Sequence, residues 1–405
     1  MLAGSHVSAN PDRPVKGFPH DRSFGWLSLA LVAAYFVVGL WPFVFHPPNR
    51  ATWLTGRAGL HFEPYGIAYD PVPLPRPAPS DAVGPSATFT VELWIEPQDG
   101  PANNVLDILT IHNPHLPCDF VLGQWKRDFR LRATTYPLPR TGKIPEVGVD
   151  NALVKGKAQF ITVRSDGTGT DFYLDGTMAG HFPGFILNAE ALNGQLILGN
   201  SASGKNSWTG RLLGFSLYNR ALDPADITWR YALWTQGRTG QLTNAPGLTA
   251  RYFFDEGRGQ QAKDSSANRH HLLIPAIFQP VHRDFLISPM KDIAYDHPDY
   301  PDIAVNILGF VPFGFCFFLY RRSLKPKQWI ANTALWVVIT GAAISLAIEV
   351  IQTWLPNRVS STTDLLTNTL GTQLGAVLAL GIRPKIAEAE AAPESNEGKE
   401  TVPSR

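Results

Sequence analysis

The sequence predicts a membrane protein built from four transmembrane helices and an all-β sandwich, with the sandwich inserted between the first and second helices. Three observations predict this fold class. Long apolar stretches lie at both ends of the 405-residue chain, residues 46–300 hold most of the Pro and Gly, and apolar residues in that middle part alternate in short segments between turns. We expect the helices at residues 24–45, 303–320, 329–355 and 365–382.

The first apolar stretch, residues 24–45, carries no charged residue and is long enough to cross the hydrocarbon core, which takes about 20 residues. Trp26 and Trp41 lie near its two ends, where aromatic residues gather in membrane helices. A cleaved signal peptide is the alternative. It would have a shorter apolar region and small residues at the cleavage site, where this chain has Trp41-Pro42-Phe43. We therefore expect a retained anchor that follows a polar tail, residues 1–23.

Composition narrows the function classes. Charged residues make up 17% of the chain and the net charge is +1, so neither a nucleic-acid partner nor an acidic substrate is indicated. The two cysteines lie in different contexts, Cys118 in the polar middle and Cys316 in an apolar stretch, so we expect no disulfide between them.

The middle of the chain is predicted to form β-strands. Short apolar-alternating segments are separated by turn signals such as Asp166-Gly167 and Asp175-Gly176, which is typical of an all-β sandwich. We expect strands at 89–96, 105–112, 120–125, 129–134, 160–164, 170–174, 196–199 and 212–218.

Two sequence features in this region resemble the laminin-G-like, concanavalin A-type lectin family. The turn Tyr173-Leu174-Asp175-Gly176 is similar to the family's hairpin turn, and the segment from Gly210 to Tyr231 is similar to its closing strand. The resemblance covers about residues 58–235 and implies a jelly-roll sandwich. Residues 247–273 resemble the segment that usually opens such domains. They would either add an edge strand to the same sandwich, giving a domain of about residues 58–275, or form a truncated second copy.

The sandwich holds weak ligand candidates. No cofactor is expected apart from calcium, for which the oxygen ligands would be Asp166, Asp171 and Asp175; the alternative is that these carboxylates only form turns. For sugar stacking the candidates are Trp125, Trp208 and Tyr136, although Trp in a sandwich is more often a core residue. The histidine pairs lack zinc-site spacing, so we expect them on the surface: His112, His115, His270 and His271.

Basic residues predict the orientation in the membrane. They cluster before the first stretch, after the second (Arg321 to Lys327) and after the last (Arg383 and Lys385), whereas the 356–363 loop carries only Arg358. The positive-inside rule then places both termini in the cytoplasm of a multi-pass protein of the cytoplasmic (inner) membrane, with the sandwich outside. The apolar-poor tail, residues 383–405, should be disordered.

That orientation brings polar residues of three helices to one depth, near the outer membrane boundary. Polar groups in an apolar span are expensive, so they mark a site by default. The alternative is an interfacial salt-bridge network, in which Arg358 pairs with Asp364 or Glu349. The residues of this predicted polar site are Asp302, Asn306, Glu349, Gln352, Arg358, Asp364 and Asn368.

The same region resembles the VanZ-like membrane family over the first helix and residues 302–381. The matching positions are Asn306, Pro312, Gly314, Glu349, Gln352, Arg358, Asp364, Asn368 and Gly371. The main departure is that about 255 residues of sandwich replace the short loop that normally follows the first helix. The resemblance implies a protein of the cell envelope whose function is connected with tolerance of glycopeptide antibiotics or with envelope polysaccharide. It does not imply a particular reaction.

Three functions fit these features. In the first, the sandwich binds an envelope glycan or glycolipid and presents it to the polar site, with the lipid bilayer as the other partner. In the second, an enzyme acts on a polyprenyl-linked saccharide, with Glu349 or Asp364 as general base and Arg358 binding phosphate. In the third, the chain is an anchored structural or adhesive module without chemistry. The sequence makes no prediction of the oligomeric state.

Overall fold

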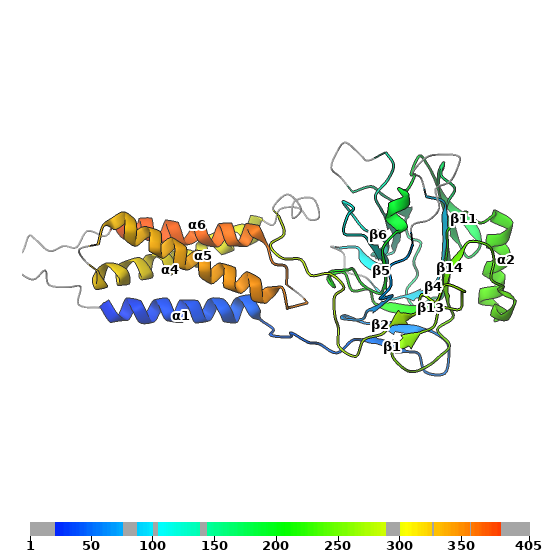
Figure 1. Cartoon of the computed structure of the whole chain (residues 1–405), viewed down its shortest axis with the longest axis horizontal. Coiled ribbons are helices and arrows are strands. Elements are labelled where there is room, and N and C mark those ends of the chain that lie inside the picture. The colour runs from blue at the N-terminus through cyan, green and yellow to red at the C-terminus, as the bar shows by residue number, and fades with distance from the viewer. Residues whose placement is uncertain are drawn as a thin grey trace, which may run out of the picture. The chain divides into compact units, whose positions relative to one another are not determined.

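The computed structural model describes residues 21–75, 87–99, 104–137, 144–288, 300–325, 328–356 and 358–381. The predicted tail 383–405, and most of the predicted tail 1–23, lie outside these ranges. The chain divides into two compact units, which Figure 1 labels by element. One unit contains the long helices. The other contains Leu40–Pro298 together with Glu349–Ser361, the residues around the loop that joins the last two helices.

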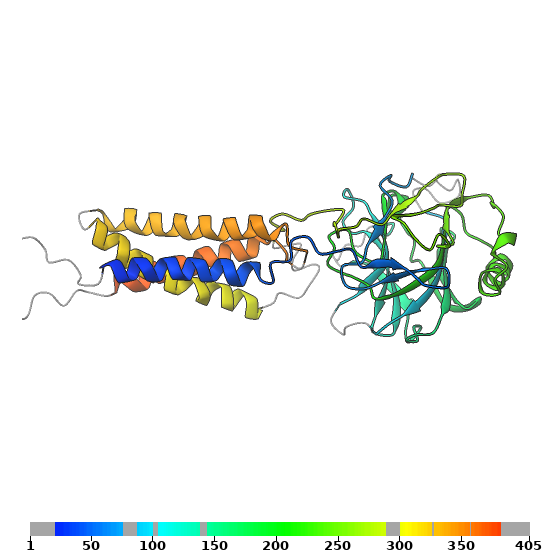
Figure 2. The same cartoon turned by 90° about the horizontal axis from the view of Figure 1, so that it is seen from below.

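The helical unit is built on four long helices, which run side by side in Figures 1 and 2. Three of them are long and apolar enough to cross a membrane, with spans at 22–40, 301–324 and 330–352. The fourth has 19 residues and is less apolar, so a fourth crossing stays a prediction. The helices are α1 (Asp21–Leu40), α4 (Tyr300–Leu324), α5 (Ile330–Gln352) and α6 (Thr362–Leu380).

Threonines lower the hydropathy of α6, and local hydrogen bonds satisfy several of them. The Oγ1 atoms of Thr367, Thr369 and Thr372 each donate to the backbone carbonyl four residues earlier, at 2.9, 2.6 and 3.0 Å. Such bonds lower the cost of placing a hydroxyl in an apolar environment. The composition of α6 is therefore compatible with a membrane environment.

Glycines let α4 and α6 pack backbone to backbone. A Cβ atom added to Gly371 would lie 2.2 Å from the Ile307 carbonyl oxygen, and one added to Gly375 would lie 2.1 Å from that of Val311. The first helix is attached differently, because the Tyr35 hydroxyl donates to the Gly309 carbonyl at 2.7 Å. Small residues at a helix contact are typical of membrane bundles.

The second unit is a sandwich of two antiparallel sheets. The first sheet has the order β1-β2-β13-β4-β9-β10-β11, with β14 also paired to β13: β1 (Ala51–Trp53), β2 (Leu60–Phe62), β13 (Gly210–Tyr218), β4 (Phe89–Pro97), β9 (Gln159–Ser165), β10 (Gly169–Leu174), β11 (Thr177–Pro183) and β14 (Leu248–Tyr252). The second has the order β15-β16-β3-β12-β5-β6-β7-β8: β15 (Gln261–Ala262), β16 (Leu272–Leu273), β3 (Ala68–Tyr69), β12 (Gln195–Leu198), β5 (Leu106–His112), β6 (Phe120–Trp125), β7 (Asp128–Arg132) and β8 (Glu146–Val149).

Residues 247–273 complete this sandwich and are not a second copy. Strand β14 pairs with β13 in the first sheet, from Phe215–Tyr252 to Tyr218–Leu248. Strands β15 and β16 extend the second sheet through β3. The core between the sheets takes apolar side chains from both, and Tyr252 and Leu272 belong to it.

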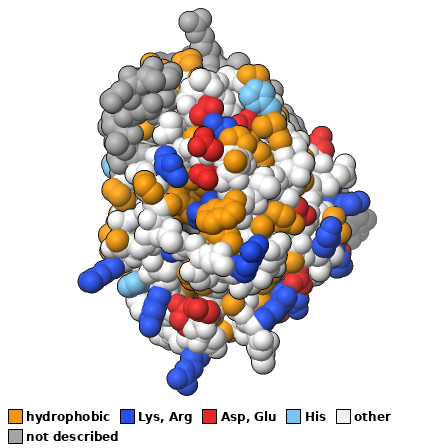
Figure 3. Space-filling model, turned by 90° about the vertical axis from the view of Figure 1, so that its right-hand side faces the viewer, with side chains coloured by type: hydrophobic (Ala, Val, Ile, Leu, Met, Phe, Trp, Pro, Cys, Tyr) orange, Lys and Arg blue, Asp and Glu red, His pale blue; other side chains and the backbone are white. Residues whose placement is uncertain are grey.

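Short helices lie around the sandwich. In the described residues these include the single 3-10 turns Ala189–Leu192 and Thr239–Gln241 and the helix α2 (Pro224–Thr235). Figure 3 looks onto the end of the molecule that carries α2, where hydrophobic side chains are mixed with charges of both signs.

A buried ion pair fixes α2 to the first sheet. Arg230 on α2 donates through Nε to Oε1 of Glu92 on β4 at 2.8 Å, and the two side chains are 4% and 0% exposed. The indole of Trp234 donates to the other Glu92 oxygen at 3.3 Å. Gly214 makes room for that ring, since a Cβ there would lie 2.5 Å from it.

Candidate functional site

Hydrogen bonds connect several of the predicted polar residues across the helices of the helical unit. The Asn306 amide on α4 donates to Oδ1 of Asp364 on α6 at 2.9 Å. The Asn368 amide on α6 donates to the hydroxyl of Ser345 on α5 at 3.0 Å. Asp302 lies in the first turn of α4 and is exposed. Two amides of the predicted site therefore link three helices.

Around Asn368 the helical unit has a fully buried polar interior. Ser345 and Thr372 are inaccessible to solvent, and Asn368 is 7% exposed. The Asn368 Oδ1 atom is buried and has no hydrogen-bond partner among the described residues. Ser345 was not predicted as a site residue, although its spacing of four before Glu349 places both on one face of α5. That spacing is the sequence signal that would have found it.

The other predicted polar residues belong to the second unit. Glu349 is 2% exposed, and its Oε2 accepts the backbone N–H of Ser361 at 2.8 Å. Gln352 is also buried. Arg358 donates through Nη2 to the Trp41 carbonyl at 3.0 Å, which ties the loop after α5 to the segment after α1. A bond between Arg358 and either carboxylate stays a prediction.

The loop after α5 also pairs with the last described segment of the sandwich unit. The backbone N–H groups of Leu286 and Ile287 donate to Ser360, to its hydroxyl at 3.1 Å and its carbonyl at 2.9 Å. The guanidinium of Arg283 lies 4.2 Å from the ring centre of Trp354. The sequence contained no signal for this pairing, because the two segments lie far apart in the chain.

The three aromatic sugar-stacking candidates have different environments. Trp208 is fully buried in the core and donates through Nε1 to Oε1 of Gln124 at 2.8 Å, so it offers no ring face to a ligand. Trp125 is half-buried, and the Lys126 ammonium lies 4.8 Å from its ring centre. Tyr136 is 43% exposed and keeps a solvent-facing ring.

The three calcium candidates act as turn and ion-pair residues. Asp166 accepts the N–H and hydroxyl of Thr168 within its own turn, at 3.0 and 2.6 Å. Asp171 pairs with Arg164 at 2.9 Å, and Asp175 accepts the Phe160 N–H at 2.9 Å. No group of three His, Cys, Asp or Glu residues able to hold a metal ion occurs in the described parts of the chain.

One histidine expected on the surface is buried. His270 is 8% exposed, and its Nδ1 lies 2.7 Å from Oδ2 of Asp70, which is 1% exposed. Burial raises the pKa of Asp70, and the N–H of Val72 and the bond from His270 partly offset this. The pair joins the segment before β16 to the residue after β3, and so helps to hold this edge of the second sheet together. Both cysteines are buried and free.

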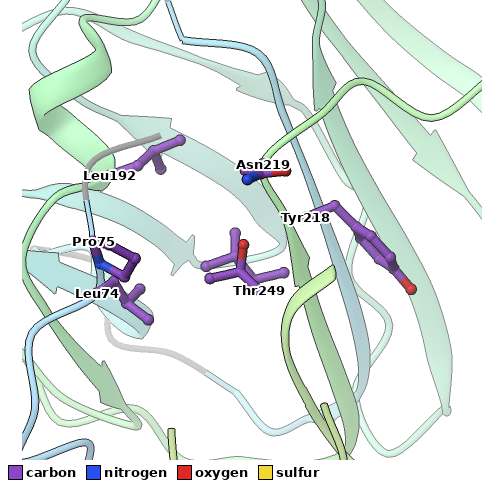
Figure 4. A pocket seen from close by; sticks show the side chains of 7 residues that line it. Leu74, Pro75, Leu192, Tyr218, Asn219 and Thr249 are labelled. Atoms are coloured by element: carbon purple, nitrogen blue, oxygen red, sulfur yellow. The ribbon is translucent and has the colours of Figure 1, made fainter. Parts of the chain in front are cut away.

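Two hollows in the described part of the sandwich bear on ligand binding. The first, shown in Figure 4, is lined by Leu74, Pro75, Leu192, Tyr218, Asn219 and Thr249 together with Leu217, and its volume of about 40 Å³ suits a water molecule. The second has about 210 Å³ and lies where β4 ends, beside the β6–β7 turn and the loop before β9. It is lined by Gln98, Asp99, Gln124, Lys126, Arg127, Leu153, Val154 and Lys155. We call it the basic hollow.

Comparisons with known proteins agree with this arrangement. Residues 70–228 match the concanavalin A-like lectin/glucanases superfamily, and residues 249–383 match the VanZ/LLP1 family. No curated protein matches the chain.

Three of the similar solved structures are the following. A candidate carbohydrate-binding protein from Bacteroides ovatus is 14% identical with a TM-score of 0.39, and the match covers 57% of this chain and 60% of that one. Domain 4 of a GH43 extracellular arabinanase from Geobacillus stearothermophilus, in complex with arabinotriose, is 15% identical with a TM-score of 0.31, covering 45% and 85%. A heptameric SAP-like pentraxin from Limulus polyphemus is 13% identical with a TM-score of 0.30, covering 44% and 78%.

The chain thus spans less than two thirds of the Bacteroides ovatus protein. Both resemblances predicted from the sequence are confirmed by the family matches. The chain therefore contains a region that matches the concanavalin A-like superfamily and a region that matches the VanZ/LLP1 family, together with three helices that are long and apolar enough to cross a membrane.

Proposed function

We propose that this protein is a receptor of the cell envelope. Its concanavalin A-like domain binds a glycan or glycolipid, and its helices hold that domain at the cytoplasmic membrane. The observation that carries the proposal is the covalent connection. The strands of the domain run from Ala51 to Leu273, and a membrane-length apolar helix lies on each side, ending at Leu40 and beginning at Tyr300.

The domain's connection at both ends restricts where it can bind. A domain held by two membrane helices stays close to the bilayer surface, which raises the effective concentration of surface ligands without any new contact. The ligands that such a domain meets are glycans of the envelope and headgroups of lipids. The positive-inside pattern supports the sandwich on the outer side, where those glycans lie.

The buried polar groups of the helical unit support a second contact in the same receptor. Asn368 has a buried amide oxygen without a partner in the described part of the chain, beside the buried Ser345 and Thr372. A polar group in a membrane span is expensive and marks a functional site by default. A hydroxyl group of a glycolipid would supply a hydrogen-bond donor there.

A binding experiment tests the proposal. The full-length protein, reconstituted in lipid nanodiscs, is applied to arrays of envelope polysaccharides, peptidoglycan fragments and lipid-linked saccharides, with and without calcium. We expect selective binding to at least one saccharide class. A folded nanodisc preparation that binds none of them would contradict the proposal.

A membrane enzyme is the second candidate, favoured by one observation. Glu349 is buried and its carboxylate is held by the Ser361 N–H, which is how a catalytic carboxylate is positioned. The substrate would be a polyprenyl-linked saccharide. If Glu349→Gln and Asp364→Asn proteins insert normally and keep the full cellular function, this candidate is excluded.

A further inference from the structure

We propose that the basic hollow binds an anionic group of the glycan, a carboxylate or a phosphate ester. This inference rests on the proposed receptor function and narrows its ligand to acidic saccharides. The hollow lies where β4 ends, between the β6–β7 turn and the loop before β9.

The charges around the hollow favour an anion. Three cationic side chains line it, Lys126, Arg127 and Lys155, against one carboxylate, Asp99. Asp99 is already engaged by Lys155, so Lys126 and Arg127 are the cations left to face a ligand. Arg127 is exposed and forms no ion pair with any described residue. Residues 100–103, which follow Asp99, are Gly-Pro-Ala-Asn and carry no charge.

A buried amide holds the turn that carries two of these cations. The side chain of Gln124 is 2% exposed, and its Nε2 donates to the carbonyls of Gln98 and Lys126, each at 2.8 Å. Its Oε1 accepts the indole N–H of Trp208 at 2.8 Å. With these bonds the amide links the end of β4, the β6–β7 turn and the core. The backbone of the turn at Lys126 is therefore held in place before a ligand arrives, which lowers the ordering cost of binding.

A second buried amide holds the opposite rim. Gln159, which is 5% exposed, accepts the Val154 N–H at 2.6 Å and donates to the Ala152 carbonyl at 2.7 Å. The rim that carries Lys155 is thereby fixed to β9. Both walls of the hollow are preorganised by side chains that solvent barely reaches.

Trp125 has a positioning role in this arrangement. Its ring lies under the Lys126 ammonium at 4.8 Å and near the Arg130 guanidinium at 5.8 Å. Cation–π contacts of this kind help to hold a cation in place, because the ring face is electron-rich. Trp125 thus helps to keep Lys126 at the hollow.

The size of the hollow also limits the ligand. Its volume of about 210 Å³ is below that of sites that enclose drug-sized ligands. It therefore suits one charged sugar residue, or one phosphodiester unit of a polymer, whose remaining chain stays outside.

The test uses full-length protein in nanodiscs of uncharged lipid. The probes are galacturonic acid oligomers, their neutral methyl esters, and a poly(glycerol phosphate) polymer, which distinguish carboxylate from phosphate. The variants are Lys126→Gln and Arg127→Gln at the hollow, because these are the two cations that Asp99 does not engage. Arg258→Gln and Lys263→Gln are matched controls, because both side chains are exposed and neither lines the hollow.

We expect an acidic probe to bind more tightly than the neutral ester. We expect Arg127→Gln to weaken that binding about tenfold or more, because a hydrogen bond to a charged group typically contributes about 1.5–3 kcal/mol. The control variants should bind like the wild type. Asp99→Asn should strengthen binding, since it frees Lys155 from its carboxylate.

The outcomes separate the two proposals. If neutral glycans bind as well as acidic ones, or if the hollow variants bind like the wild type, the receptor function stands and the anionic site is overturned. If neither these probes nor the wider arrays bind, the receptor function itself fails and the anionic site with it.

Discussion

At the scale of single residues, Asp107 gives the sandwich a pH-dependent stability. This carboxyl on β5 is 3% exposed and accepts the Thr110 hydroxyl at 3.3 Å. Burial raises its pKa to about 7, and the charge of Arg132 only partly offsets that effect. The folded protein therefore holds this proton more tightly than the unfolded chain does. Its contribution to stability is complete below about pH 4 and is lost as the pH rises through about 7.

The Asp107→Asn variant tests this linkage. The amide carries no charge, so we expect the variant to be more stable than the wild type at pH 8, by on the order of 1–4 kcal/mol. At pH 4 the two proteins should be similar. Thermal unfolding of the purified protein at both pH values measures the difference. Asp255→Asn, at an exposed carboxyl, is the control. An equal difference at both pH values would contradict the linkage.

The buried pair of Glu92 and Arg230 should respond differently to single and double substitution. Glu92→Leu leaves Arg230 buried without its carboxylate, and breaking a buried pair in this way costs about 3–5 kcal/mol. Removing both charges, in Glu92→Leu with Arg230→Met, should restore most of that stability. Denaturant unfolding of the three variants measures the coupling. A double variant as unstable as Glu92→Leu alone would mean that the α2 contact depends on the charges themselves.

Single-residue roles were the hardest part to predict from the sequence. Trp208 was predicted as a sugar-stacking candidate, yet its ring is buried and hydrogen-bonds to Gln124, which lies 84 residues away in the sequence. His270 was expected on the surface, yet it meets Asp70, 200 residues away. Neither long-range partner has a local signal, because residue type and spacing do not report which distant strand lies opposite.

At the scale of elements, the close packing of α4 and α6 predicts which glycines are essential. Gly371→Ala would place a Cβ atom 2.2 Å from a backbone carbonyl of α4, which cannot move aside as a flexible side chain can. We expect this variant to lose the assembled helical unit, seen as a lower thermal aggregation temperature in detergent. Gly309→Ala is the matched control, because a Cβ there meets nothing within 4 Å. Equal stability of the two variants would contradict the packing argument.

Long, regularly patterned elements were predictable, and very short ones were not. All eight strands predicted from alternation are present, as β4, β5, β6, β7, β9, β10, β12 and β13. The missed strands include two-residue edges such as β15 (Gln261–Ala262), which are too short to show an alternating pattern. The four helices are also present, with bounds that differ by a few residues at their ends.

At the scale of the whole molecule, the sequence predicted the order of parts well, because each part has its own composition. Membrane-length apolar stretches and strand-like alternation can each be recognised within a short piece of sequence. The order of helical and strand-rich parts along the chain can therefore be predicted. The pairing of Ser360 with Leu286 and Ile287 could not be predicted from the sequence. It joins the loop after α5 to a distant segment of the chain through two backbone N–H groups, and such donors carry no residue-specific signal.

The orientation of the chain depends on whether α6 crosses the membrane. If it does, four crossings bring both termini to the cytoplasmic side, as the basic residues after the α4 and α6 helices require. If it does not, the C-terminus lies outside. The threonine hydroxyls of α6 that bond to their own helix, and the burial of Asn368 and Thr372, reduce its polar surface. We therefore predict a fourth crossing.

Fusions of green fluorescent protein and alkaline phosphatase test the orientation, because the first is fluorescent only in the cytoplasm and the second is active only outside. We expect a fusion after Gly381 to be fluorescent and a fusion after Ser360, in the loop before α6, to show phosphatase activity. A fusion after Lys325, in the loop before α5, is the cytoplasmic control. If the fusions after Ser360 and Gly381 report the same side, α6 does not cross. The polar residues that α6 carries would then lie at the membrane surface, and the argument for a buried polar contact through Asn368 would fail.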